Sequence, residues 1–265
     1  MLRSLKDLEG YMVTASDGDI GSVADFLWDD ERWIIRYLVV QTGGFLSLEG
    51  RQVLISPISF RQAEWSSRRF HLALTSDKVK SSPSVDADKP VSRQYEQTYQ
   101  RYYGYPLYWE CSGFGGMRSS GLAPGMWDEA SPEGSNKPSG DGDVHLRSDK
   151  EIRGYHIQGS DEAIGHIQDC IIDDETWRVH YLVIDTSNWW LGKSVLIAPH
   201  WASRISWAER KVFVDLSRQK IKESPEWNPE TGVNREYETR LYDYYGRPAD
   251  QLIGGFPEST QGTMR

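Results

Sequence analysis

Histidine serves acid–base catalysis near neutral pH and binds transition metals, so the six histidines are the first candidates for chemistry. His166 and His180 belong to segments with strand character and could meet on neighbouring strands. The sequence holds no His-Glu-x-x-His or His-x-His pattern for a metal, and no Gly-x-Ser-x-Gly pattern for an activated serine. We therefore predict no catalytic residue, no metal site and no cofactor. A bound metal, or a deep pocket holding both histidines, would instead favour an enzyme.

Acidic residues supply the oxygen ligands that calcium takes, and they gather at Asp17 with Asp19, at 29–31 and at 173–175. None of these clusters has the spacing of an EF-hand loop. Because Asp side chains bond nearby backbone amides in turns, the pattern favours hairpin turns over calcium binding. Asp25 and Asp169 differ, because each lies inside an apolar strand pattern and must find hydrogen-bond donors or face water. We predict that both are hydrogen-bonded residues at a barrel rim, and their role stays open.

Bulky apolar side chains occur in a connection that begins at Gly43-Gly44, which has neither the lysine of a phosphate-binding loop nor dinucleotide-binding spacing. The residues are Phe45, Leu46 and Leu48, and in a second, similar connection Trp189, Trp190 and Leu191. Exposed apolar clusters mark interaction surfaces, and Trp is enriched where binding energy concentrates. We predict an interaction role for these residues, as a surface for a partner or for self-association. The alternatives are that they fold over their own β domain or are buried between the two sequence copies described below.

Tyrosines recur at helical spacing in two places. The positions are Tyr95, Tyr99, Tyr102 and Tyr103, and later Tyr237, Leu241, Tyr244 and Tyr245. Spacings of four, seven and eight residues place them on one face of a helix, which ends at Gly104 or Gly246. Such a stripe could be a ligand platform, but helix packing against a β domain is the more typical use.

The sequence repeats itself. Leu2-Arg3-Ser4 returns as Leu146-Arg147-Ser148, and the same spacing relates Gly10-Tyr11, Asp25, Trp33 and Tyr37-Leu38-Val39 to later residues. After one loop the spacing shortens by two residues, and the match continues to Tyr102-Tyr103-Gly104 and Tyr244-Tyr245-Gly246. Two copies of one domain follow from this pattern. We call residues 1–106 the first copy and 144–248 the second copy, with a Gly/Ser/Pro-rich linker at 107–143 and a flexible tail at 249–265.

Short alternating segments bounded by turn residues predict strands. In the first copy they are 11–14, 20–28, 33–42, 52–56, 58–65 and 69–74, and in the second copy 164–172, 177–186, 194–198, 201–207 and 211–216. Segments 76–80 and 217–222 predict short helices that stop before Ser-Pro.

These residues resemble the PRC-barrel family. The features are Gly10-Tyr11, the turn from Asp17-Gly18 to Gly21, Val23-Ala24-Asp25, the aliphatic strand 37–40, the loop 43–46 and Val53-Leu54-Ile55-Ser56-Pro57. The second copy repeats the pattern but carries Glu162 in place of the turn glycine. The trailing Tyr-rich helix is similar to that of stand-alone bacterial members. The resemblance implies a mainly β fold of two tandem small barrels with short C-terminal helices, which we expect to form a pseudo-two-fold pair.

The resemblance also guides the expected function. Family members include the cytoplasmic domain of the photosynthetic reaction-centre H subunit and the C-terminal domain of a ribosome-maturation factor, which implies a docking or assembly surface. We predict a non-enzymatic interaction module with an unidentified protein partner, which could also be a homo-oligomer or an intramolecular pseudo-dimer. The alternatives are an RNA- or ribosome-associated accessory role and an assembly role like that of the H subunit.

Composition narrows these choices. The formal net charge is -9, and no Lys/Arg run is longer than Arg68-Arg69, which disfavours nucleic-acid binding. No apolar stretch has the length of a signal peptide or a membrane span. The two cysteines, Cys111 and Cys170, form no disulfide framework or metal pattern, so we expect a cytoplasmic location.

Overall fold

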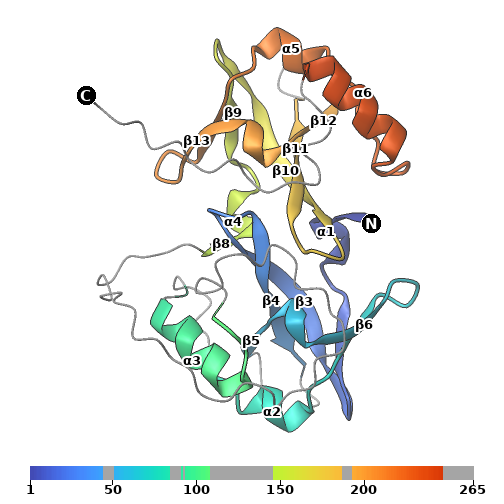
Figure 1. Cartoon of the computed structure of the whole chain (residues 1–265), viewed down its shortest axis with the longest axis vertical. Coiled ribbons are helices and arrows are strands. Elements are labelled where there is room, and N and C mark those ends of the chain that lie inside the picture. The colour runs from blue at the N-terminus through green and yellow to red at the C-terminus, as the bar shows by residue number, and fades with distance from the viewer. Residues whose placement is uncertain (44–50, 84–90, 92, 108–145, 187–192, 247–265) are drawn as a thin grey trace. The chain divides into compact units, whose positions relative to one another are not determined.

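The computed structural model describes residues 1–43, 51–83, 91, 93–107, 146–186 and 193–246 (Figure 1). They separate into two compact units. Unit 1 contains Met1, Arg3–Ile152 and Asp169–Val179, and unit 2 contains Leu2, Arg153–Gln168 and His180–Arg265. The units do not follow the two sequence copies, because 146–152 and 169–179 of the second copy belong to unit 1.

The element order of the first copy recurs in the second. In the first copy the elements are β1 (Leu2–Ser4), α1 (Leu5–Leu8), β2 (Met12–Ala15), β3 (Gly18–Asp29), β4 (Ile34–Thr42), β5 (Gln52–Ile55), η2 (Pro57–Ser59), β6 (Phe60–Glu64), β7 (Arg69–Leu72), α2 (Ser76–Lys80) and α3 (Arg93–Tyr103). In the second copy they are β8 (Leu146–Ser148), α4 (Asp149–Ile152), β9 (His156–Gln158), β10 (Ala163–Asp173), β11 (Val179–Asp185), β12 (Ser194–Ile197), η4 (Pro199–Trp201), β13 (Ala202–Ser206), β14 (Lys211–Val214), α5 (Arg218–Lys222) and α6 (Arg235–Tyr245). The chain is therefore mainly β with a few short helices.

The strands form two mixed sheets. One has the order β5-β4-β3-β2-β7-β6, with β8 also paired to β3. The other has the order β12-β11-β10-β9-β14-β13, with β1 also paired to β10. Both sheets are mixed, because β2 pairs with β7 and β9 with β14 in parallel, whereas pairs such as β3 with β4 and β11 with β12 are antiparallel. These paths end at different strands without closing, so the two closed barrels stay a prediction.

Tight hairpins join the longest strands, and their acidic residues shape the turns as predicted. The Asp29 carboxylate accepts hydrogen bonds from the backbone N–H groups of Glu31 and Arg32, at 3.1 and 3.0 Å. Asp173 does the same for Glu175 and Thr176. Each turn ends at a tryptophan with positive φ, Trp33 at 55° and Trp177 at 58°. A bulky residue in this region is strained, so the surrounding contacts must hold it there.

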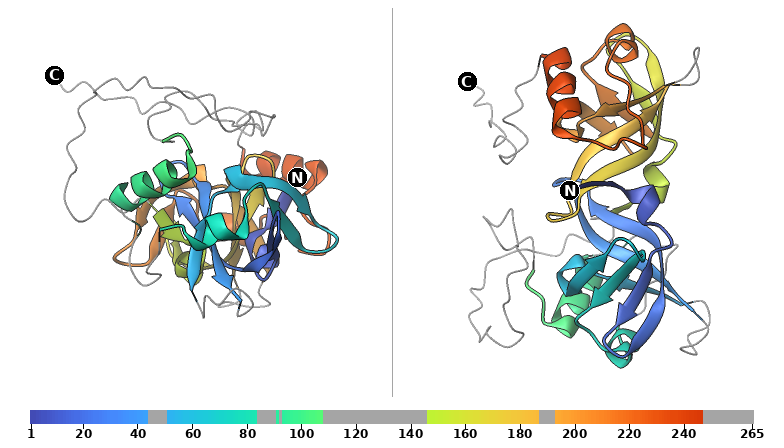
Figure 2. Two further views of the ribbon diagram at one scale, coloured as in Figure 1. Left: turned by 90° about the horizontal axis from the view of Figure 1, so that it is seen from below. Right: turned by 90° about the vertical axis from the view of Figure 1, so that its right-hand side faces the viewer.

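Helix α3 covers the sheet of unit 1 (Figures 1 and 2). Tyr99 and Tyr103 are buried in one cluster with residues of β4 and β5. The Tyr99 hydroxyl donates to the carbonyl of Leu54 at 3.2 Å, and the Tyr37 hydroxyl donates to buried Glu96 at 3.2 Å. Burying a large side chain contributes about 1.5–3 kcal/mol, so the tyrosine stripe is a main source of helix attachment.

Helix α6 is held in a similar way within unit 2 (Figure 2). The Asn234 side chain accepts from the N–H of Tyr237 at its start, and Gly246 ends it with φ of 66°. The Tyr181 hydroxyl donates to Glu238 at 2.8 Å, and Leu241 is fully buried. In the part of the chain that the structure describes, no helix is long and apolar enough to cross a membrane.

Candidate docking site

Strand β3 pairs with two different segments, β2 and β8, along one of its edges. Its first half pairs with β2, from Gly18 opposite Ala15 to Ser22 opposite Met12. Its second half pairs with β8, with Leu27 opposite Ser148, Trp28 opposite Arg147 and Asp29 opposite Leu146. Without β8 this half of β3 would present unpaired backbone groups, which invite the addition of another strand. Residues from β3 to α4 all belong to unit 1.

Asp25 lies at the point where the edge changes partner. Its carboxylate accepts from the Ser148 hydroxyl at 2.5 Å, from the Lys150 N–H at 3.2 Å and from the Phe26 N–H at 2.8 Å. Burial raises the pKa of Asp25 above its ordinary value, and the hydrogen bond from Ser148 opposes the rise. The carboxylate predicted to need donors therefore finds two of its three donors in the second copy.

The Ser148 hydroxyl has two functions. It donates to Asp25, and it accepts from the backbone N–H of Glu151 at 3.1 Å, which caps the first turn of α4. Serine followed three residues later by an acidic residue is the sequence pattern of such a cap. The cap and the contact with β3 therefore depend on the same atom.

Two more side chains attach this segment. The Arg147 Nε atom lies 3.1 Å from the Asp30 carboxylate, and these side chains are only 18% and 12% exposed. Leu146 is 5% exposed and packs in the cluster that contains Tyr99 and Tyr103. The three consecutive residues of β8 thus supply one apolar anchor, one ion pair and one charge-assisted hydrogen bond.

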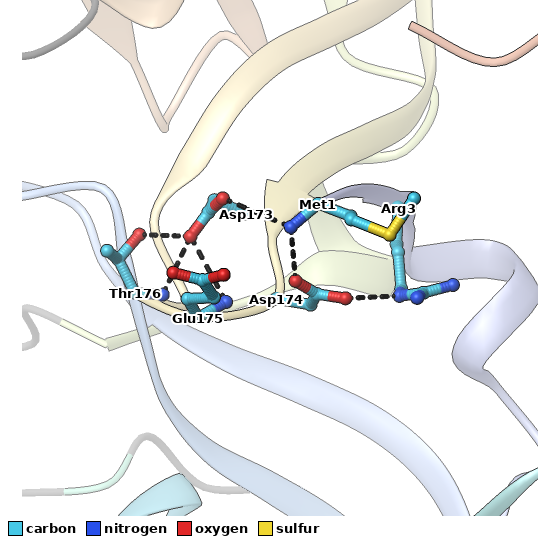
Figure 3. A network of polar contacts seen from close by, with 6 residues as sticks. All are labelled: Met1, Arg3, Asp173, Asp174, Glu175 and Thr176. Atoms are coloured by element: carbon cyan, nitrogen blue, oxygen red, sulfur yellow. Dashed lines mark hydrogen bonds and ion pairs between the residues drawn. The ribbon is translucent and has the colours of Figure 1, made fainter. Parts of the chain in front are cut away.

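The start of the chain makes the equivalent contacts with the segment 169–179, also inside unit 1. Asp169 accepts from the Ser4 hydroxyl at 2.5 Å and from the Lys6 N–H at 3.1 Å. Arg3 Nε lies 2.6 Å from the Asp174 carboxylate, which also contacts the α-amino group of Met1 (Figure 3). Ser4 caps α1 by accepting from the Asp7 N–H at 3.0 Å.

The two hairpin tips also pair through their backbones. The Ile35 N–H donates to the Trp177 carbonyl at 2.8 Å, and the Val179 N–H donates to the Trp33 carbonyl at 2.7 Å. The Trp177 ring lies 5.4 Å from the ring of Phe60. These contacts explain how the strained tryptophans of the turns are held.

The family model of the PRC-barrel domain matches residues 145–221. The chain contains a PRC-barrel domain. No curated protein matches the chain. The matched PRC-barrel residues include both the segment 146–148, which docks on β3, and Asp169, which receives Ser4.

Several predicted site residues fall outside the described residues. They are Phe45, Leu46, Leu48, Trp189, Trp190 and Leu191, together with Cys111. Cys170 is buried. His166 lies opposite His156 in the pairing of β10 with β9, and its Nε2 atom is 3.8 Å from Asp185. Among the described residues, no group of three or more His, Cys, Asp and Glu side chains could hold a metal ion.

The tyrosine stripes lie in the cores of their units. Tyr99, Tyr103, Tyr237, Leu241 and Tyr245 are buried, whereas Tyr95, Tyr102 and Tyr244 are half-buried. The half-buried members still use their hydroxyls: Tyr102 donates to the Lys78 carbonyl at 2.7 Å, and Tyr244 to the Lys220 carbonyl at 2.6 Å. Burial raises the pKa of Tyr103 to about 12, so this phenol stays neutral at physiological pH.

Proposed function

We propose that this chain is a non-enzymatic interaction and assembly module with two PRC-barrel copies in a pseudo-two-fold arrangement. The observation that carries the proposal is the docking of 146–152 on β3. Strand addition to a sheet edge is a common mode of protein recognition, with the backbone giving affinity and side chains giving selectivity. Here a segment of one sequence copy completes a sheet of the other through backbone pairing, Asp25 and Asp30.

The repeated element order supports the presence of a PRC-barrel in each copy. The sheet paths of the two copies are equivalent strand by strand, including the parallel pair formed by the fourth and fifth strands on each path. The family match at 145–221 contains all the strands of the second copy, β8 to β14, and the internal repeat relates them to the first copy. The low cysteine content of the sequence supports the cytoplasmic location that we propose.

Partner capture tests the proposal. The tagged full chain, the variant Trp190→Ala and the control Glu209→Ala, whose side chain is 51% exposed, would be compared by quantitative mass spectrometry. We expect one defined set of proteins with the wild type and the control, and its loss with Trp190→Ala. A wild-type chain that enriches nothing over an untagged control would contradict the proposal. Salt-sensitive recovery of ribosomal components would favour the RNA-associated alternative instead.

A further inference from the structure

We propose that the edge of β3 from Asp25 to Asp30 recognises segments of the pattern Leu-Arg-Ser-x-x-acid, and that a second copy of this chain can supply the segment. This inference rests on the proposed interaction function and names its ligand. In the structure, the chain's own Leu146-Arg147-Ser148-Asp149-Lys150-Glu151 occupies the site.

Backbone pairing fixes the position of the segment. Three consecutive residues of β8 face three consecutive residues of β3. Side chains alternate between the two faces of a strand, so a slip by one residue would turn Leu146 away from its cluster. A ligand must therefore place its apolar residue opposite Asp29 and its serine opposite Leu27.

Leu146 is the apolar anchor of the interaction. At 5% exposure it lies in the cluster formed by the tyrosine stripe of α3 with Tyr37, Val39 and Leu54. Removing this side chain would leave a cavity in the core of unit 1, because neighbouring side chains close such gaps only partly.

Charge selects the next two residues. Asp30 accepts from Arg147 and Asp25 accepts from Ser148, and an acidic residue in place of either would face a carboxylate in a half-buried position. Opposed like charges of this kind reject wrong partners. The acid three residues after the serine belongs to the capping pattern of α4.

The arginine and serine contacts of this recognition occur a second time in unit 1, through Arg3 and Ser4. Leu2-Arg3-Ser4 is the identical tripeptide, with Arg3 paired to Asp174 and Ser4 to Asp169. Both copies of the duplicated Arg-Ser pair thus bind equivalent carboxylates, which supports recognition of the pattern. Every molecule carries two such segments and two such acceptors, so a second copy of the chain presents matching chemistry.

Complementary full-length variants test the inference. The donor-defective chain carries Arg147→Glu and Ser148→Ala, with its β3 edge intact. The acceptor-defective chain carries Asp25→Ala and Asp30→Ala, with its 146–152 segment intact. We expect a 1:1 complex in light scattering when the two chains are mixed, in excess of any self-association of the donor-defective chain, which keeps Leu2-Arg3-Ser4. Association of either variant alone to the same extent, or no complex from the mixture, would overturn the proposal.

A peptide probe separates the site from the rest of the chain. A labelled peptide of residues 144–153 should bind the donor-defective chain at least tenfold more tightly than the wild type, whose site is occupied. Adding Asp25→Ala should abolish binding, and a peptide with Arg147→Glu should not bind. Equal binding of the two peptides would refute recognition of the pattern.

The fold of each variant is checked by circular dichroism. If the donor-defective chain is unfolded, Ser148→Ala alone replaces it, with the same expected outcomes at reduced fold-change. Wild-type partner capture tests the proposed function separately, because it can succeed while both of these binding experiments fail.

Discussion

Replacing Asp25 with alanine is the most direct perturbation of the docking site. It removes the acceptor of three hydrogen bonds, from the Ser148 hydroxyl and from the N–H groups of Phe26 and Lys150. A hydrogen bond to a charged group contributes about 1.5–3 kcal/mol net, and an ordinary one about 0.5–1.5 kcal/mol. The serine can turn toward water, and removing the partly buried charge recovers some solvation energy. We therefore expect Asp25→Ala to lower the free energy of unfolding by about 3 kcal/mol.

Urea unfolding of the full chain, followed by tryptophan fluorescence, measures this loss. Asp25→Asn should cost about 1 kcal/mol, because its amide oxygen still accepts from both N–H groups and its NH₂ can donate to Ser148. Asp77→Ala is the matched control, since the Asp77 side chain is 90% exposed, and it should change stability by less than about 0.5 kcal/mol.

A double-mutant cycle with Ser148→Ala decides whether the loss arises at this contact. If the docking contact is responsible, the double variant should be more stable than the sum of the single losses predicts, by about 1 kcal/mol. Additive losses, or an effect of Asp25→Ala no larger than that of the Asp77 control, would refute the assignment of Asp25 to segment docking.

Three further outcomes follow from the same structure. Burial raises the folded-state pKa of Asp25 above its unfolded value, so protonation of Asp25 adds stability as the pH falls through the raised pKa. In urea unfolding from pH 7 to pH 4, the free energy of unfolding of the wild type should therefore rise relative to that of Asp25→Asn as the pH falls. Gly21→Ala would place a Cβ atom 2.0 Å from the Gln41 carbonyl oxygen and should cost about 3 kcal/mol in the same assay, whereas Gly43→Ala, with no atom within 4 Å, should cost little. Tyr37→Phe removes the 3.2 Å hydrogen bond to buried Glu96 and should lower the melting temperature measured by calorimetry, at a cost of about 1–3 kcal/mol.

The long strands were predictable from the sequence because their patterns of apolar and polar residues extend over about ten residues. The pattern of 20–28 predicted a strand, and β3 covers Gly18–Asp29. The apolar run 33–42 corresponds to β4, Ile34–Thr42. The two longer helices were equally predictable, because tyrosines recur in them at helical spacing. A glycine follows each tyrosine stripe, and in α6 this residue, Gly246, ends the helix with a positive φ. Periodicity over ten residues leaves few alternatives.

The docking segments were missed because they are too short for periodicity. β8 has three residues and α4 has four, so neither completes a pattern that distinguishes strand from helix. A usable signal was present in Ser4 with Asp7 and in Ser148 with Glu151, each the capping pattern of a helix start. Reading it would have placed both helices, although not the carboxylates that their serines contact.

The identity of those carboxylates lies beyond any reading of a single duplicated sequence. Ser4 and Ser148 are equivalent positions of the repeat, and so are Asp25 and Asp169. The sequence is therefore equally compatible with each serine binding the aspartate of its own copy and with each serine binding the aspartate of the other copy. In the structure each serine binds the aspartate of the other copy, and Ser148 is bonded to Asp25 across 123 residues of sequence.

A segment supplied by another molecule would make the same contacts as the segment supplied by the chain itself. Covalent attachment raises the local concentration of the chain's own segment, and this advantage, not a difference in contacts, favours the intramolecular arrangement. Assembly between molecules should therefore depend on whether the attached segment is released, which makes the contacts of Ser148 and Arg147 the point of control.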